Sequence, residues 1–333
     1  MTYCDWIDSK RKSDSLIYLN NHDSIEIIYT NALELDPSFA PALQALSKLY
    51  LNKGDLKKAN EFSIKAVQAD EDFRDWSLKI SKISELIQKG HKSVKQESYD
   101  DASRFYQSIL ENHPYYPDAE FYRGLTRFRQ KDIESAAIHF YNALQIYPHH
   151  EKAKKGLDNV VKQFLNMGNK SYKSGNISNA TKYYEKSLEF DPEFYLAHFQ
   201  LGVLEKRQGN SQSAISNFNK VLELNPEHYK TWFSIGTAYD SDGDIDKAIE
   251  YYKKAIDINS EYSKAYGNLG RLYTEKGEYV KAEELLKTII QIDSSYADGF
   301  MRLGFLYITQ EKFDDAIVNL ELSIDLDEND FNK

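Results

Sequence analysis

A glycine recurs every 34 residues through the second half of this 333-residue chain. The glycines are Gly168, Gly202, Gly236, Gly270 and Gly304. An alanine recurs in the same register twelve residues later, at Ala180, Ala214, Ala248, Ala282 and Ala316. A period of this length that holds over five copies is typical of a repeat protein, in which each repeat packs on its neighbours rather than folding as a separate globule.

Each repeat has the pattern of two amphipathic helices. Large apolar residues lie three or four positions from the glycine and from the alanine, which is the spacing of one helix face. A turn pair such as Gly243-Asp244 separates the two helices, and Pro192 and Pro226 end the second helix in two of the repeats. Because glycine and alanine have little or no side chain, the two helix axes can approach to about 8–10 Å.

These residues resemble the tetratricopeptide repeat family, whose pattern is Trp-x2-Leu-Gly-x2-Tyr, then Ala-x3-Phe-x2-Ala, then Pro. One copy follows it at Trp232, Ile235, Gly236, Tyr239, Ala248, Tyr252 and Ala255. Earlier copies are centred on Gly90 and Gly124, and an eroded first copy keeps Ile25, Tyr29 and Ala32. The resemblance covers nearly the whole chain. It implies an all-α fold, a right-handed superhelical solenoid of about nine helix-turn-helix repeats.

The period is interrupted twice, by extra segments at 74–82 and 151–160. Neither segment contains proline, and apolar residues such as Leu78, Ile83 and Ile87 continue the helical spacing into the next repeat. We therefore predict two lengthened first helices; two plain insertions are the alternative. The predicted blocks are 6–73 with repeats 1 and 2 (repeat 1 degenerate), 74–150 with an extended helix and repeats 3 and 4, and 151–330 with an extended helix and repeats 5 to 9.

Composition narrows the classes of partner. Acidic residues outnumber basic ones by 52 to 42, for a net charge of -10, which argues against a general nucleic-acid binder. The single cysteine, Cys4, excludes a disulfide framework and indicates a reducing compartment. The N-terminus lacks an apolar signal segment, and the longest uncharged stretch is too polar to cross a bilayer. We expect a cytoplasmic protein that binds neither nucleic acid nor membrane.

The sequence contains no familiar catalytic signature. It has no Walker loop, no dinucleotide-binding glycine pattern, no His-Glu-x-x-His and no nucleophile elbow. The segment Asp240–Asp246 looks like a calcium loop, but the positions that need Gly and Glu hold Ile245 and Tyr251. We therefore expect no enzymatic activity, no cofactor and no metal.

Function in such a solenoid is expected on a surface. In the family that this chain resembles, the first helices line a concave groove with the second, fifth, sixth, ninth and twelfth residues of each repeat. The resemblance implies a peptide-binding groove formed by Lys162, Leu165, Asn169, Phe199, Val203, Lys230, Phe233, Lys264, Arg271, Met301 and Phe305. We predict a non-catalytic scaffold that binds an extended partner segment with acidic and apolar side chains. The alternative is that Phe199 and Phe233 pack within the solenoid and that the lysines are merely solvated.

Two narrower resemblances suggest alternative roles. The stretch from Phe121 through Tyr147 and on to Gly168 is similar to nine-repeat co-chaperones that carry a J domain, which implies a client-holding co-chaperone. The His-Pro-Asp motif of a J domain is absent, because His113-Pro114 is followed by tyrosine. The second alternative is a targeting adaptor similar to the repeat part of O-linked N-acetylglucosamine transferases. That family has a ladder of asparagines at the sixth position of its repeats. In the last five repeats of this chain, two of these positions hold asparagine, Asn166 and Asn268.

The last predicted helix is apolar and has no polar capping helix after it. It carries Leu320, Leu322, Ile324 and Leu326. Solenoids usually need a polar cap at each end. Either the acid-rich residues 325–330 solubilise this end or another surface covers it, and the sequence suggests self-association through the C-terminal repeat.

Overall fold

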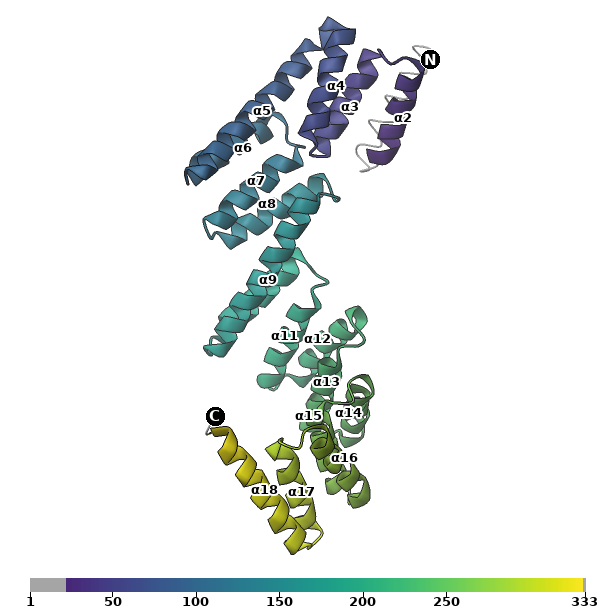
Figure 1. Cartoon of the computed structure of the whole chain (residues 1–333), viewed down its shortest axis with the longest axis vertical. Helices are drawn as coiled ribbons and strands as arrows, with labels where there is room; N and C mark the ends of the chain where they lie inside the picture. The colour runs from purple at the N-terminus through teal and green to yellow at the C-terminus, as the bar shows by residue number, and fades with distance from the viewer. Residues whose placement is uncertain (1–21, 332–333) are drawn as a thin grey trace. The chain divides into compact units, whose positions relative to one another are not determined.

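The computed structural model describes residues 22–331, with side chains from 23 to 327. These residues form seventeen α-helices and one 3-10 turn, and none of them lies in a strand. The prediction of an all-α solenoid is confirmed. Packing divides the chain into two compact units, Met1–Phe164 and Leu165–Lys333 (Figure 1). Cys4 and the predicted first helix of repeat 1 lie outside the described residues.

The first unit is a series of antiparallel helix pairs. Its helices are α2 (His22–Leu35), α3 (Ala40–Asn52), α4 (Leu56–Ala69), η1 (Glu71–Phe73), α5 (Arg74–Lys95), α6 (Tyr99–Asn112), α7 (Pro117–Arg129) and α8 (Ile133–Ile146). The pairs α3–α4, α5–α6 and α7–α8 are each one repeat, and α2 is the second helix of the degenerate first repeat. The boundary between the units falls inside α9 (Glu151–Lys173).

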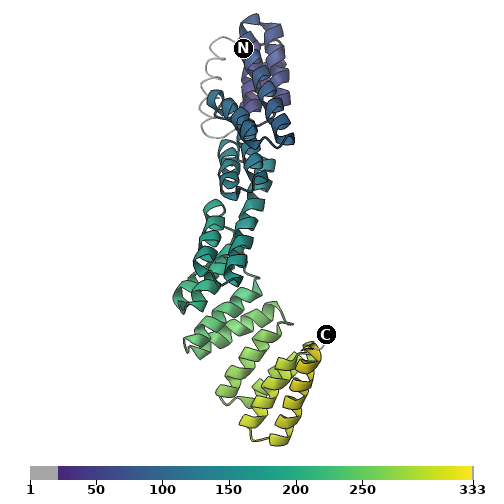
Figure 2. The same ribbon diagram turned by 90° about the vertical axis from the view of Figure 1, so that its left-hand side faces the viewer.

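After α9, the second unit is built from the same kind of helix pair, with first helices of 13 residues. Its remaining helices are α10 (Ile177–Phe190), α11 (Tyr195–Arg207), α12 (Ser211–Leu224), α13 (Tyr229–Ser241), α14 (Ile245–Ile258), α15 (Ser263–Glu275), α16 (Tyr279–Ile292), α17 (Ala297–Thr309) and α18 (Phe313–Phe331). Figure 2 shows the green-to-yellow helices of this unit side by side in chain order. A second helix packs on its own first helix and, where another repeat follows, on the first helix of that repeat, as α14 does on α13 and α15.

The turn inside each repeat is fixed by backbone geometry and by a side-chain cap. Gly54, Gly175, Gly209, Gly243 and Gly277 have φ between 75° and 84°, a region that glycine enters without steric cost. The next residue often caps the following helix. The Asp244 carboxylate, for example, accepts a hydrogen bond from the Lys247 backbone N–H at 3.3 Å. Three turns place a side-chain-bearing residue in the same backbone region: Glu97, Lys131 and Glu311.

The recurring glycine of the first helix makes room for a ring from the second. A Cβ atom on Gly202 would lie 2.5 Å from the Phe218 ring, a distance that real contacts do not reach. Phe218 is completely buried. The predicted close approach of the two helices is therefore confirmed, and the side chain four residues after the alanine fills the space that the glycine leaves.

Both lengthened first helices are continuous, so the two extra segments are helical, as the spacing predicted. The helix α5 has 22 residues and α9 has 23, against 13 for α7 or α11. In α5 the prediction misplaced one residue, because Leu78 is 61% exposed while Ile80 is buried. The buried face runs through Ile80, Ile83 and Ile87, at spacings of three and four, and Leu78 lies on the other side of the helix.

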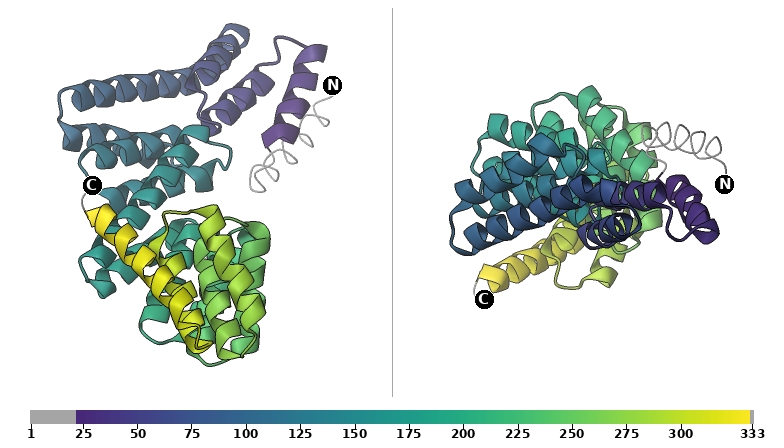
Figure 3. Two further views of the ribbon diagram at one scale, coloured as in Figure 1. Left: turned by 60° about the horizontal axis from the view of Figure 1, so that its bottom comes forward. Right: turned by 90° about the horizontal axis from the view of Figure 1, so that it is seen from above.

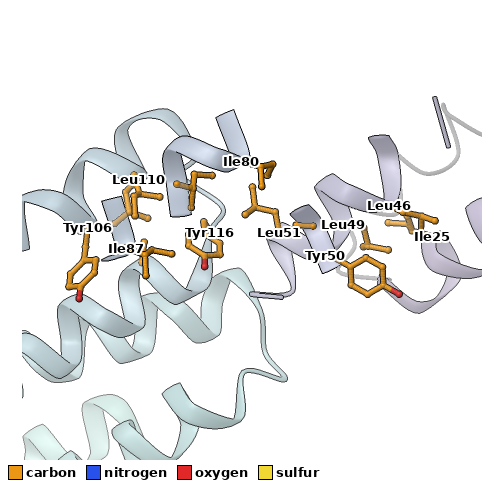
Figure 4. Packing of buried hydrophobic residues seen from close by; sticks show 14 of the residues in the cluster. Ile25, Leu46, Leu49, Tyr50, Leu51, Ile80, Ile87, Tyr106, Leu110 and Tyr116 are labelled. Carbon is orange, nitrogen blue, oxygen red and sulfur yellow. The ribbon is translucent and has the colours of Figure 1, made fainter. Parts of the chain in front are cut away.

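The core of the first unit is a continuous apolar layer between neighbouring helices. Figure 4 shows Ile25, Leu46 and Leu49 packed together from adjacent helices. Ser47 occupies the position that glycine holds in later repeats, and its hydroxyl donates to the Ala59 carbonyl at 2.6 Å. The Trp76 indole N–H donates to the same hydroxyl at 2.8 Å, which anchors the extension of α5 to the preceding repeat. None of the helices described is long and apolar enough to cross a membrane.

Candidate functional site

The first helices of successive repeats in the second unit meet along one side, which we call the first-helix face. It is formed by α11, α13, α15 and α17, and α11 contacts α13 while α15 contacts α17. The predicted groove residues on it are Phe199, Val203, Lys230, Phe233, Lys264, Arg271, Met301 and Phe305. Leu165 and Asn169, on the part of α9 inside this unit, belong to the same helix series, and Lys162 lies just before the unit boundary.

Phe199 and Phe233 occupy equivalent places and make equivalent contacts. The Phe199 ring lies 5.8 Å from the Phe218 ring of its own repeat and 5.1 Å from His228, which lies just before the next repeat. The Phe233 ring lies 5.5 Å from Tyr252 and 5.2 Å from Tyr262 in the same way. Both phenylalanines are half-buried. Each ring therefore fastens two repeats together and leaves only part of its surface for a ligand.

The row formed by the Phe199 and Phe233 rings ends at Gly267. There a side chain of the next repeat, Arg302, fills the space of the missing ring. A Cβ atom on Gly267 would lie 2.9 Å from Nε of Arg302, so the arginine occupies the space that a side chain at this position would take. The same Nε donates to the Asp298 carboxylate at 2.6 Å. Asp298 also holds the position that Lys230 and Lys264 hold in their repeats. The row of rings and the basic row thus both stop before α17, where Met301 and Asp298 take these two positions.

Polar side chains of the first-helix face also form bonds between neighbouring repeats. Lys206 donates to the Thr237 hydroxyl at 2.7 Å. One repeat later, Arg271 forms an ion pair with Asp240, which also accepts a hydrogen bond from the Tyr252 hydroxyl at 3.0 Å. Arg271, a predicted groove residue, is therefore engaged within the chain, and it pairs with Glu275 as well.

Lys206 is a candidate binding residue that the sequence prediction omitted. Its ammonium is half-buried, and burial lowers its pKa below the usual range. Its hydrogen-bond acceptor is a neutral hydroxyl, and no carboxylate within the described part of the chain forms an ion pair with it. The signal was present in the sequence, because Lys206 is the twelfth residue of its repeat and the twelfth position belongs to the expected lining.

The other predicted residues differ in accessibility. Lys162, Lys230 and Lys264 are exposed, Val203 and Met301 are half-buried, and Phe305 is 55% exposed. Leu165 is buried in the apolar core of its repeat. Asn169 is half-buried and accepts a hydrogen bond from the Tyr184 hydroxyl at 2.9 Å. The most accessible aromatic surface in this set thus lies on α17 and not at the middle of the row.

The segment that looks like a calcium loop is an ordinary turn. Asp240 is paired with Arg271, and Gly243 adopts a φ of 81°. Asp244 caps α14 and also forms an ion pair with Lys247 at 2.6 Å. Across the residues with described side chains, no three His, Cys, Asp or Glu side chains come together in an arrangement that could hold a metal ion.

Several solved structures resemble parts of the chain. MamA residues 41 to the end from Desulfovibrio magneticus RS-1 is 19% identical, with a TM-score of 0.45 over 51% of this chain and 96% of that one. The Thermus thermophilus protein TTC0263 is 20% identical, with a TM-score of 0.44 over 52% and 94%. YrrB, described as a TPR protein with an unusual peptide-binding site, is 20% identical, with a TM-score of 0.41 over 56% and 91%.

Two curated proteins are similar over a shorter segment. The proteins named DnaJ homolog subfamily C member 7 from Homo sapiens and from Mus musculus are each 34% identical over 96 residues. That segment is 28% of this chain and 19% of each relative, so the chain matches less than a fifth of their length.

Family models for the tetratricopeptide repeat match along most of the sequence. The matched residues are 40–73, 88–151, 164–194, 199–263, 241–299 and 297–330. They agree with the helix pairs of both units and with the glycine and alanine register from which each pair is built. The chain belongs to the tetratricopeptide repeat family.

Proposed function

We propose that this chain is a non-catalytic protein-interaction scaffold whose first-helix face binds an extended peptide with acidic and apolar side chains. The observation that carries the proposal is Lys206, a half-buried cation without an ion-pair partner in the described chain. A carboxylate on a bound peptide would supply that partner, and a charge-assisted hydrogen bond in a partly dehydrated site is stronger than one in water.

The exposed lysines and the apolar residues have different roles in this proposal. Lys230 and Lys264 lie in the open, where cations mainly raise the rate of encounter with an acidic partner and orient it. Phe305 and Met301 supply apolar surface for anchoring side chains. Phe199, Phe233 and Val203 support this surface and add their exposed edges. Arg271 braces it through its ion pairs, and Leu165 and Asn169 continue the helix series on α9.

The test is selection of binding peptides from a random display library on the intact chain, followed by affinity measurement. We expect enrichment of Asp and Glu next to apolar residues. The triple substitution Lys206→Met, Lys230→Met and Lys264→Met should weaken binding of the enriched peptides by about tenfold or more. A matched control changes three lysines of second helices, Lys182, Lys220 and Lys253, to Met, with the same loss of charge. Equal binding by both triple variants would refute the acidic-peptide assignment.

The similarity to DnaJ homolog subfamily C member 7 favours one second candidate, a client-holding co-chaperone. The measurement is light scattering by an unfolded test protein with and without the intact chain. Suppression of aggregation at a stoichiometric ratio would support this role, and Phe305→Glu should reduce it. Aggregation at the same rate with and without the chain would exclude it.

A further inference from the structure

The last helix of the second unit presents apolar side chains on the face that the other repeats cover. Ile317 is 54% exposed, whereas Ile215 and Ile249, at the same position of their repeats, are 5% and 8% exposed. The difference arises because α13 packs on α12 and α15 packs on α14. Among the described helices of this unit α18 is the outermost, next to α17 (Figure 3, left).

Three further exposed residues join Ile317 to form what we call the end face: Ile308, Phe313 and Ile324. Ile308 holds the place in α17 that Lys206 and Asp240 hold in α11 and α13. At that place Lys206 bonds to Thr237 and Asp240 to Arg271 of the following repeat, whereas Thr274 donates to Gly270 within its own helix. The end face thus includes a place from which two of the earlier repeats contact the next first helix.

The outward side of α18 is also apolar. Val318 and Leu322 are exposed there. In α14 the same two positions hold Glu250 and Lys254, which form an ion pair at 2.6 Å. A helix that is apolar on more than one side is typical of a buried helix. An exposed apolar patch on a repeat end indicates an interaction site rather than a polar cap.

The acidic charge of α18 indicates which kind of helix the end face can bind. The segment Phe313–Phe331 has seven acidic residues and no Lys or Arg. Glu321 lies four residues after Ile317 and three before Ile324, and Asp327 lies three after Ile324, so both acidic residues are on the same side of α18 as the apolar ones. A second copy that docked its own α18 here would bring two acidic helices together, which is unfavourable.

We propose that the end face binds an amphipathic helix of another protein, in which Lys or Arg residues flank an apolar stripe. The helix would lie on α18 as α15 lies on α14. Its apolar side chains would cover Ile317 and Ile324, and its basic residues would pair with Glu321 and Asp327. The end face meets the first-helix face at Ile308 on α17, but Lys206, Lys230 and Lys264 of the peptide site lie on α11, α13 and α15, so binding here does not require those lysines.

The probe is a synthetic helical peptide of about 20 residues, long enough to hold a helix on a surface. It carries the apolar spacing of α15 with lysine at the other positions, and a partner peptide has glutamate in place of each lysine. We expect the intact chain to bind the lysine peptide at least about tenfold more tightly than the glutamate peptide. The double variant Glu321→Lys, Asp327→Lys should reverse that preference, and both substituted residues are exposed, so folding should be retained.

The apolar contribution is tested with Ile317→Glu and Ile324→Glu together, which should weaken the lysine peptide by about tenfold or more. The matched control is Ile138→Glu, a similarly exposed isoleucine on α8 in the other unit, which should change affinity less than about twofold. The triple lysine variant of the first-helix face should bind the lysine peptide as wild type does.

Equal affinity of the chain for the lysine peptide and the glutamate peptide would overturn the proposal. So would sedimentation showing a dimer that Ile317→Glu abolishes, because a second copy would then occupy this face.

Discussion

At the scale of single residues, the turns within the repeats show how backbone conformation selects the amino acid. Most hold a glycine with positive φ, but Lys131 adopts a φ of 64° and bears a side chain. An L-residue in this region costs roughly 1–2 kcal/mol relative to its preferred conformations. The sequence indicated the glycine turns by pairs such as Gly209-Asn210 and Gly243-Asp244. The turn at Lys131 has no glycine, so its positive φ had no sequence signal of this kind.

A pair of substitutions measures this cost. Gly209→Ala should lower the free energy of unfolding by about 1 kcal/mol, because no atom lies within 4 Å of the added Cβ and only the backbone conformation resists it. Lys131→Gly should raise the free energy of unfolding by roughly 0.5 kcal/mol, since relief of the strain exceeds the entropy lost on ordering glycine. Urea denaturation of the two variants checks both signs. A stabilised Gly209→Ala would show that these turns do not need positive φ.

Arg123, on α7, is half-buried and has one buried nitrogen without a hydrogen-bond partner among the described residues. Its Nε atom is buried and makes no hydrogen bond with any described residue, and burial lowers the pKa of the guanidinium. We expect Arg123→Met to raise the free energy of unfolding by about 1 kcal/mol, because it removes an unsatisfied donor and keeps the apolar stem. Arg104→Met, at an exposed site nearby, should change stability by less than about 0.5 kcal/mol. Destabilisation by Arg123→Met would reveal that the guanidinium has a partner in solution.

Glu26 links α2 to α3 through two hydrogen bonds. Its carboxylate accepts from the Lys53 ammonium at 2.6 Å and from the Tyr50 hydroxyl at 2.5 Å. Burial alone would raise the Glu26 pKa, but these hydrogen bonds and the Lys53 charge hold it below the ordinary value of 4.5. The stabilisation is therefore complete above pH 4.5 and is lost as the pH falls through the lowered pKa.

The expected size of this effect is about 0.5–1 kcal/mol, because the pair is partly exposed to solvent. Glu26→Gln should remove it, so that wild type and variant differ at pH 7 and converge near pH 2. Thermal unfolding across that range is the measurement. A constant difference at all pH values would show that the carboxylate charge does not contribute.

At the scale of the helices, the repeat depends on matched positions in its two members. Sequence reasoning placed the helix pairs, the extensions and the close glycine, because each leaves a periodic trace. It did not place Leu78 correctly. The extra residues of α5, which has 22 residues against 13 in α7, allow two apolar faces, and only contact with the preceding repeat selects Ile80. It also could not foresee Arg302 in the space above Gly267, because that contact joins residues 35 positions apart.

The glycine–ring contact is testable by adding one methyl group. Gly202→Ala should lower the free energy of unfolding by about 1–3 kcal/mol, because the new Cβ meets the fully buried Phe218 ring at 2.5 Å. Gly267→Ala is the matched control, since its nearest neighbour is the movable side chain of Arg302. There the better helix propensity of alanine should leave stability unchanged or slightly higher. Equal effects in denaturant titrations would mean that the Phe218 ring can move aside.

At the scale of the whole chain, the repeats and their helix pairs could be predicted, whereas the contacts that each candidate groove residue makes could not. Packing divides the chain once, after Phe164. The predicted division into three blocks, after residues 73 and 150, stays a prediction. The site residues were assigned by position in the repeat, which indicates where a side chain starts but not what it contacts. Phe199 and Arg271 are examples, because both are bound to neighbours within the chain.

Stability should also vary along the second unit. Hydrogen–deuterium exchange should be faster in α18 than in α14, because Ile317 is exposed where Ile249 is covered by the next repeat. Mass spectrometry of peptic fragments resolves the two helices. Addition of the lysine-bearing helical peptide should slow exchange in α18 and leave α14 unchanged. Equal protection of both helices in the free chain would contradict this gradient.

The bonds between repeats described above have one more consequence. Lys206 to Thr237 and Asp240 to Arg271 each join residues 31 positions apart, and the Arg302 contact spans 35. Each repeat therefore needs to fit only the repeat on either side of it. A gene for such a chain can gain or lose a block of 34 codons and still encode a continuous core, so its history is expected to be one of whole-repeat duplication and loss as much as of point mutation.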